Sequence, residues 1–202
     1  MSLPNQLSLL RILLTPVFIV LLFMDTSVSR LFSMVVFTLA SLTDWYDGYA
    51  ARKLGDVSMW GKFLDPLADK ILVSSGFICF CILGYITPWM VLIVVIRDFL
   101  ITGLRSYAVI KRKPIATTML AKVKTFSQIG VLYLIFIYHL FIAEGYQGGL
   151  WEKIQEFNII FALMYIIIFL TIISGLLYII GNRSHLRQMG CDIYHIFIPS
   201  DV

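Results

Sequence analysis

The chain has 202 residues, of which 59% are hydrophobic and only 14% are charged. A soluble domain has about 45–50% apolar and about 25% charged residues, because its surface must be covered by polar groups. The net charge of +4 is too small to indicate a nucleic-acid-binding protein. The composition therefore predicts an integral membrane protein, with enough apolar sequence for six helical spans of about 20 residues each.

Six apolar segments are long enough to cross a membrane as helices. In chain order they cover residues 7–24, 31–51, 63–85, 89–110, 125–143 and 157–181. Polar and turn-forming residues separate them, and no connection is large enough for a soluble domain. The sequence thus predicts one all-α membrane domain over residues 1–202. A segment at the membrane interface precedes the first span, and the tail 182–202 is expected to be interfacial or partly disordered.

The distribution of basic residues predicts the orientation. If the N-terminus is cytoplasmic, the cytoplasmic connections and the span ends beside them hold most of the Lys and Arg residues. The opposite side then holds only Arg30 and Lys153. Cytoplasmic loops of membrane proteins carry an excess of Lys and Arg, so we expect both termini in the cytoplasm.

Four aspartates flank the connection between the second and third spans: Asp44, Asp47, Asp65 and Asp69. Their spacings of three and four residues place each pair on one helical face, and a short connection can bring the two faces together. Four clustered carboxylates repel one another unless cations separate them, and an all-oxygen site suits Mg²⁺ or Mn²⁺. The alternative is four separate carboxylates, each capped or paired with Lys62 or Lys70.

The residues between these aspartates indicate an anionic ligand. Gly48 and Ala51 share the helical stripe of Asp44 and Asp47, and they leave room for a bulky group beside the carboxylates. An arginine beside a cation site can bind a further phosphate oxygen. With Arg52 and Gly61, the stretch is therefore typical of a diphosphate site, although small residues also permit close helix packing in membranes.

The pattern Asp44-x2-Asp47-Gly48-x2-Ala51-Arg52-x8-Gly61-x3-Asp65-x3-Asp69 resembles the complete signature of the CDP-alcohol phosphotransferase family over 26 residues. Members of that family transfer a phosphoryl-alcohol group from a CDP-alcohol to a second alcohol and release CMP. The resemblance implies that the four aspartates hold two divalent cations and that Asp69 is the catalytic base. It also implies that Gly48, Ala51, Arg52 and Gly61 contact the CDP group, and that the protein is a homodimer.

A second polar group lies in the fourth and fifth spans. Arg97, Asp98, Thr102 and Arg105 fall within one arc of a helix, and Lys122 and Lys124 precede the fifth span. Charges inside a span should face a hydrated cavity and be paired. We therefore predict that Arg97, Arg105, Lys122 and Lys124 bind a phosphate of the acceptor. Two alternatives stay open, namely lysines that only flank a span and a purely structural pair between Arg97 and Asp98.

The stretches 5–11, 61–70 and 97–105 resemble bacterial members of the family that use CDP-diacylglycerol and glycerol 3-phosphate. The chain departs from that pattern at Asp98, where Glu is expected, and at Ala121, where Gly is expected. The resemblance implies a location in the bacterial inner membrane. Other acceptors stay possible: inositol phosphate, serine or a second phospholipid. A cation transporter could also use the aspartates, but such a role leaves Arg52 and Gly61 unexplained.

Two further features bear on the site. Asn5, Ser8, Arg11 and Thr15 form a polar stripe on the first span, which either borders the nucleotide pocket or reflects capping and snorkelling. His139 lies toward the other end of the fifth span, so we predict an interhelical hydrogen bond for it and no catalytic role.

Overall fold

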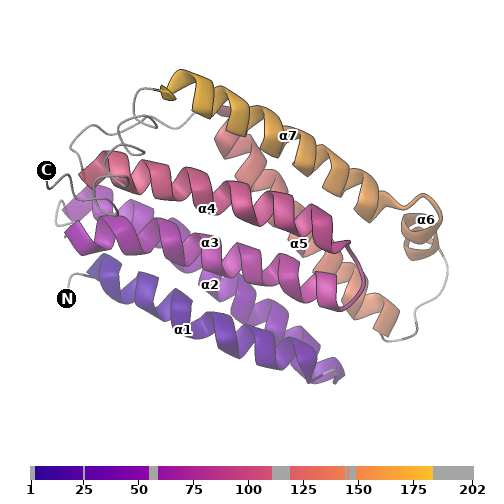
Figure 1. The fold of residues 1–202 in the computed structure, drawn as a ribbon. Coiled ribbons are helices and arrows are strands. Elements are labelled where there is room, and N and C mark those ends of the chain that lie inside the picture. The colour runs from indigo at the N-terminus through magenta and orange to yellow at the C-terminus, as the bar shows by residue number, and fades with distance from the viewer. Residues whose placement is uncertain are drawn as a thin grey trace, which may run out of the picture.

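The computed structural model describes the backbone of residues 3–24, 26–54, 59–110, 119–143, 145 and 149–183. The side chains of residues 3–5, 44–54, 59–65, 110 and 150–152 lie outside this description. Over the described ranges the backbone forms seven α-helices and no strand (Figure 1). The helices are α1 (Leu3–Phe23), α2 (Ser27–Leu54), α3 (Met59–Ile82), α4 (Pro88–Ile110), α5 (Met119–Ala143), α6 (Leu150–Glu156) and α7 (Ile159–Gly181).

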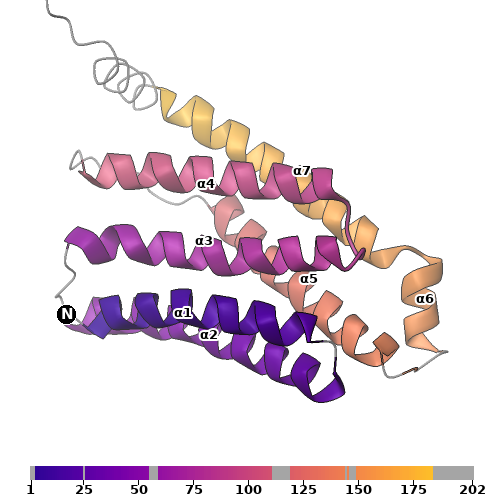
Figure 2. The same ribbon diagram turned by 60° about the horizontal axis from the view of Figure 1, so that its bottom comes forward.

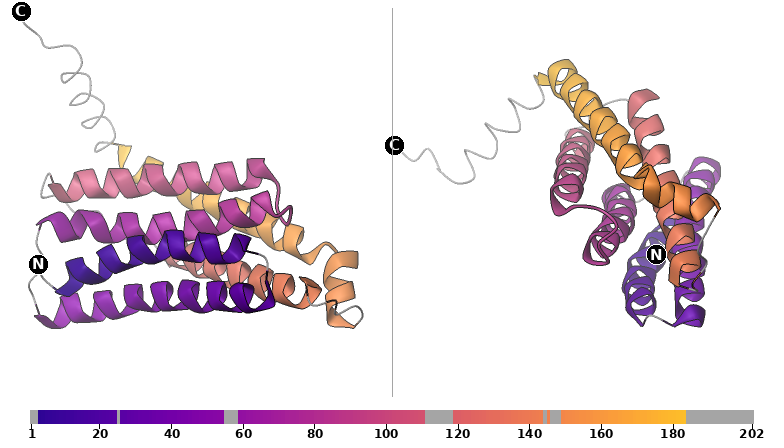
Figure 3. Two further views of the ribbon diagram at one scale, coloured as in Figure 1. Left: turned by 90° about the horizontal axis from the view of Figure 1, so that it is seen from below. Right: turned by 90° about the vertical axis from the view of Figure 1, so that its right-hand side faces the viewer.

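The six long helices alternate in direction. We call the end of the bundle at which α1 begins the near end (Figures 1 and 2). Helices α1, α3 and α5 run away from the near end, and α2, α4 and α7 run back toward it. The short helix α6 lies at the far end, where it packs against α5 and α7. Figure 3 shows that α5 and α7 are inclined relative to α3 and α4.

Three helical stretches are long and apolar enough to cross a membrane: Gln6–Phe23, Met119–Ala143 and Ile159–Gly181. The apolar stretch Ser27–Thr43 in α2 is shorter. Helix α4 has 23 residues, but any 18-residue window within it includes the three charges of Arg97, Asp98 and Arg105. The protein is therefore a multi-pass membrane protein, and the number of six spans stays a prediction.

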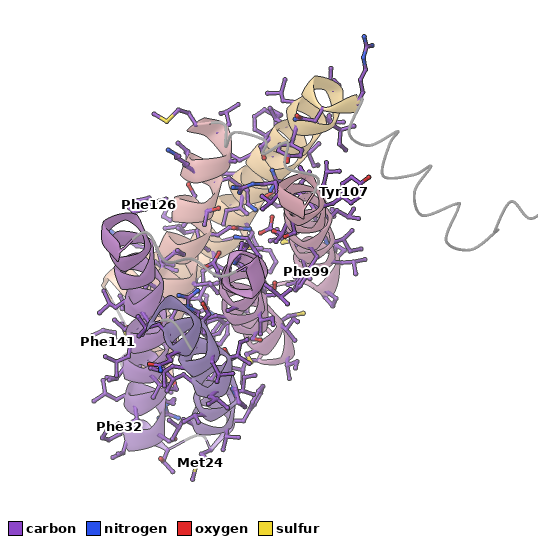
Figure 4. All side chains as sticks on the ribbon, turned by 90° about the vertical axis from the view of Figure 1, so that its left-hand side faces the viewer. Met24, Phe32, Phe99, Tyr107, Phe126 and Phe141 are labelled. Atoms are coloured by element: carbon purple, nitrogen blue, oxygen red, sulfur yellow. The ribbon has the colours of Figure 1, made fainter. Side chains whose placement is uncertain are left out.

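Large apolar side chains cover the outside of the bundle. Met24, Phe32 and Phe126 are each more than half exposed, and Figure 4 shows them on the outer surface together with Phe99 and Phe141. Exposed apolar surface of this extent is typical of a protein that faces lipid.

A cluster of aromatic rings joins α1, α2, α3 and α5. The ring of Phe136 in α5 contacts Phe18, Phe37 and Phe80 at centroid distances of 5.8, 5.2 and 4.7 Å. All four rings are fully buried. Because lipid offers no hydrophobic drive for helices to associate, such close packing is what holds them together. The cluster thus fixes α2 against α3, the two helices that carry the aspartates.

At the far end, the connection between α3 and α4 is tied to α5. The hydroxyl of Tyr85 lies 2.8 Å from Nδ1 of His139, and both residues lie near the ring of Phe80. The predicted hydrogen bond of His139 is therefore confirmed.

Candidate functional site

The aspartate motif lies on the helices that meet across the connection 55–58. Helices α2 and α3 run in opposite directions and contact each other, and α2 ends and α3 begins at the near end (Figure 1). The backbone is helical at every motif position, so the spacings of three and four residues do place each aspartate pair on one face. The side chains of seven motif residues lie outside the described residues: Asp44, Asp47, Gly48, Ala51, Arg52, Gly61 and Asp65.

Asp69 is the motif residue whose side chain the structure describes. It is 21% exposed, and its Oδ2 accepts a hydrogen bond from Nζ of Lys70 at 2.8 Å. Among the described side chains no three His, Cys, Asp or Glu residues come together. The convergence of the four carboxylates therefore stays a prediction, while Asp69 itself is accessible enough to reach a substrate.

Arg11 of α1 lies beside the aspartate helix. Its side chain is fully buried, and its Nε donates a hydrogen bond to the carbonyl oxygen of Ala40, one turn before Asp44, at 3.3 Å. Ser8 and Thr15, its neighbours in the polar stripe, are buried as well. Burial against α2 excludes snorkelling toward the membrane surface. Ser8, Arg11 and Thr15 therefore pack inside the bundle, while the place of the stripe beside a nucleotide pocket stays a prediction.

The second polar group is a network centred on Asp98 of α4, whose side chain is 2% exposed. Its Oδ1 accepts hydrogen bonds from Nζ of Lys124 in α5 and, at 3.2 Å, from Nη1 of Arg97. Its Oδ2 accepts a third from Nε2 of Gln128 at 3.2 Å. Lys124 and Gln128 are buried too. One carboxylate thus joins two cations and an amide from two helices.

Arg97 has a second anchor on α7. Its Nη2 donates a hydrogen bond to Oγ of Ser174 at 2.9 Å. A Cβ atom on Gly175 would lie 3.4 Å from Cγ of Arg97, so the glycine lets the arginine lie against the helix. Arg97 and Gly175 also border a groove of about 310 Å³ between α4 and α7, whose other lining residues are all Leu or Ile.

The network links α4 to α5 and also to α7, which packs against both of them. Within the described ranges the backbones of α4 and α5 make no close contact, so Lys124 and Gln128 reach α4 through their side chains alone. Lys70 of α3 lies close enough for its charge to act on both Asp98 and Lys124. Since Lys70 also pairs with Asp69, the network lies on the side of the bundle that carries the aspartate motif.

The predicted phosphate-binding residues differ in their surroundings. The structure brings Arg97 and Lys124 together through Asp98, while Arg105 and Lys122 are exposed. The pair between Arg97 and Asp98 is present, and it extends to α5 and α7. Arg97 and Lys124 carry two positive charges against one negative charge, so this buried group has a net charge of +1.

Four buried polar atoms around the network have no hydrogen-bond partner among the side chains and backbone that the structure describes: Nε of Arg97, Oε1 of Gln128, Oγ1 of Thr171 and the hydroxyl of Tyr178. Tyr178 packs against Ile101 and Leu104 of α4 and lies within electrostatic range of Arg97 and Arg105. Buried polar groups normally have partners, so these atoms mark a place for water or a polar ligand. The sequence analysis missed Ser174 and Tyr178, although a polar stripe in so apolar a helix was a readable signal.

Comparisons with known proteins identify the family. The family model of the CDP-alcohol phosphatidyltransferases matches residues 1–182, and the chain belongs to this family of membrane enzymes. A relative from Bacillus subtilis (strain 168) is 34% identical over 198 residues, which cover 92% of this chain and 97% of the relative. A relative from Rickettsia typhi is 34% identical over 184 residues, covering 91% and 98%. Both are named CDP-diacylglycerol–glycerol-3-phosphate 3-phosphatidyltransferase.

Proposed function

We propose that the protein transfers the phosphatidyl group of CDP-diacylglycerol to the 1-hydroxyl of glycerol 3-phosphate, giving phosphatidylglycerophosphate and CMP. The relatives named for this reaction support the proposal. The structural observation that carries it is the buried group of Arg97, Lys124 and Asp98, with two cations for one carboxylate. A net positive charge inside a membrane protein needs an anion, and a phosphate-bearing acceptor supplies one.

On the donor side, Asp44, Asp47, Asp65 and Asp69 would hold two divalent cations, Mg²⁺ or Mn²⁺. The donor set fits, because all four ligands are carboxylates and they lie on two contacting antiparallel helices. Bound there, the cations would neutralise the diphosphate of the donor. In the same proposal, the CDP group contacts Gly48, Ala51, Arg52 and Gly61.

On the acceptor side, the phosphate of glycerol 3-phosphate is bound by Arg97, Arg105, Lys122 and Lys124. Asp69 accepts the proton of the 1-hydroxyl, and the hydroxyl oxygen attacks the β-phosphorus of the donor. The bond from that phosphorus to the bridging oxygen breaks, and CMP leaves with the electron pair. Positioning and charge neutralisation supply most of the catalysis in such a transfer.

The same proposal includes the setting of the enzyme. Residues 1–202 form one domain with six spans in the inner membrane of a bacterium, as a homodimer with both termini in the cytoplasm. The excess of Lys and Arg on one side of the predicted spans supports this orientation, and the relatives are bacterial. The near end of the bundle, where α2 ends and α3 begins, then faces the cytosol and its soluble acceptor.

The experiment that tests the function is CMP release from CDP-diacylglycerol by the purified protein in mixed micelles. The panel of acceptors is glycerol 3-phosphate, inositol phosphate, serine and phosphatidylglycerol. We expect only glycerol 3-phosphate to support CMP release. Release with a different acceptor would reassign the substrate. Cation flux in proteoliposomes without any CMP release would favour the transporter instead.

Two arginine variants should separate acceptor binding from donor binding. Arg105 lies on α4, away from the motif, so Arg105→Ala should raise the KM for glycerol 3-phosphate about tenfold or more and leave that for CDP-diacylglycerol unchanged. Arg52→Ala should damage donor use or abolish turnover, because it removes charge neutralisation at the transferred group. The measurement is steady-state kinetics with each substrate varied in turn.

Lys153→Ala is the matched control, since Lys153 is an exposed cation on α6 at the far end. It should change neither KM. If Arg105→Ala raises both KM values equally, Arg105 is structural or contacts both substrates. The acceptor would then need no phosphate.

A further inference from the structure

We propose that Asp98 is a positioning residue of the acceptor site, which holds Arg97 and Lys124 in the geometry that receives the phosphate. This inference rests on the proposed function. It adds a role for a carboxylate that does not itself touch the substrate.

The contacts of Asp98 are those of a residue that fixes its neighbours. Both carboxylate oxygens are used, since Oδ1 accepts from Lys124 and Arg97 and Oδ2 accepts from Gln128. Lysine and arginine side chains lose much rotational freedom when they are fixed, so a long cation needs a partner to stay in place. Without Asp98, Lys124 would hold a buried charge and would turn toward the polar near end.

The second anchor makes the positioning of Arg97 specific. Nη1 of the guanidinium is held by Asp98 on α4, and Nη2 is held by Ser174 on α7. The remaining donor edge contains Nε, which is buried without a partner. A Cβ atom on Gly175 would lie 3.5 Å from this Nε, so the planar fork of the arginine is oriented from both α4 and α7.

The sign of the charge separates positioning from simple electrostatics. A carboxylate near a phosphate site repels the phosphate, so removing it should tighten acceptor binding if charge alone mattered. If Asp98 acts by fixing the two cations, removing it should weaken acceptor binding. The two roles therefore predict opposite changes in the acceptor KM.

The test compares Asp98→Asn with Asp98→Glu in mixed micelles, each substrate varied in turn. We expect Asp98→Asn to raise the KM for glycerol 3-phosphate about tenfold or more, with the KM for CDP-diacylglycerol unchanged. Asp98→Glu keeps the charge and should restore most of the acceptor affinity. Tyr133→Phe is the matched control, because it removes a different interhelical hydrogen bond, 3.1 Å long, to Thr38. It should move neither KM.

Three results would overturn the inference: a lower or unchanged acceptor KM in Asp98→Asn, an equal rise in both KM values, or no recovery in Asp98→Glu. If Asp98→Asn does not fold, Ser174→Ala releases Arg97 with a smaller change. It should raise the acceptor KM several-fold, and a normal KM there would also contradict the inference. A wild-type protein that does not use glycerol 3-phosphate contradicts the proposed function, whereas normal KM values in these variants contradict only the role of Asp98.

Discussion

Asp69→Asn is expected to lower the turnover number by about 100-fold or more. The amide has nearly the volume of the carboxylate, so the fold should survive the change. The variant cannot accept the proton of the attacking hydroxyl, however, and the ion pair of Asp69 with Lys70 is lost. The measurement is kcat for CMP release at saturating concentrations of both substrates, together with a thermal melt in detergent.

Glu156→Gln is the control for this variant, because it neutralises an exposed carboxylate on α6 at the far end. Its turnover should equal that of the unaltered protein. A well-folded Asp69→Asn protein with nearly normal turnover would assign the proton transfer to another group.

Removal of divalent cations with a chelator is expected to abolish CMP release altogether. In the proposed site the four carboxylates would repel one another and the donor would add a diphosphate beside them, so substrate binding would need cations. Activity should return when Mg²⁺ or Mn²⁺ is added in excess of the chelator. The assay is CMP release before and after this addition.

Mn²⁺ binding gives an independent measurement, because it can be followed by electron paramagnetic resonance without any substrate. Asp44→Asn and Asp65→Asn should each weaken the binding of Mn²⁺, while Glu156→Gln should leave it unchanged. Full activity in the presence of the chelator would contradict a metal-dependent reaction.

The apolar segments were predictable because long hydrophobic runs have few alternatives to a helix in a membrane. The residues at which these helices begin and end were harder to predict. The fifth span was expected to begin at residue 125, but α5 begins at Met119 because Lys122 and Lys124 are part of the helix. A span assigned from hydropathy leaves out charged residues such as these two lysines, even where they continue the helix. Helix α6 lies between the fifth and sixth predicted spans and was not among the predicted elements.

The site could be predicted where its residues lie close together in the sequence. The helical backbone of the aspartate motif follows from spacing within α2 and α3. The network of Asp98 does not, because Gln128 lies 30 residues after Asp98 and Ser174 lies 77 residues after its partner Arg97. Which buried polar groups meet depends on how α4, α5 and α7 cross, and single-helix periodicity does not contain that information.

The charges of α4 also bear on how the chain enters the bilayer. Arg97, Asp98 and Arg105 each disfavour insertion of an isolated segment, by about 2.5–3.5 kcal/mol near the centre of a membrane. The groups that satisfy Arg97 and Asp98 from other helices, in α5 and α7, are synthesised later. As one of the predicted spans, α4 would therefore gain its full stability in the bilayer only after α7 has been made. In a nascent chain that stops after α4, Arg97 and Asp98 lack their hydrogen-bond partners on α5 and α7. This unsatisfied pair distinguishes the incomplete protein from the complete one.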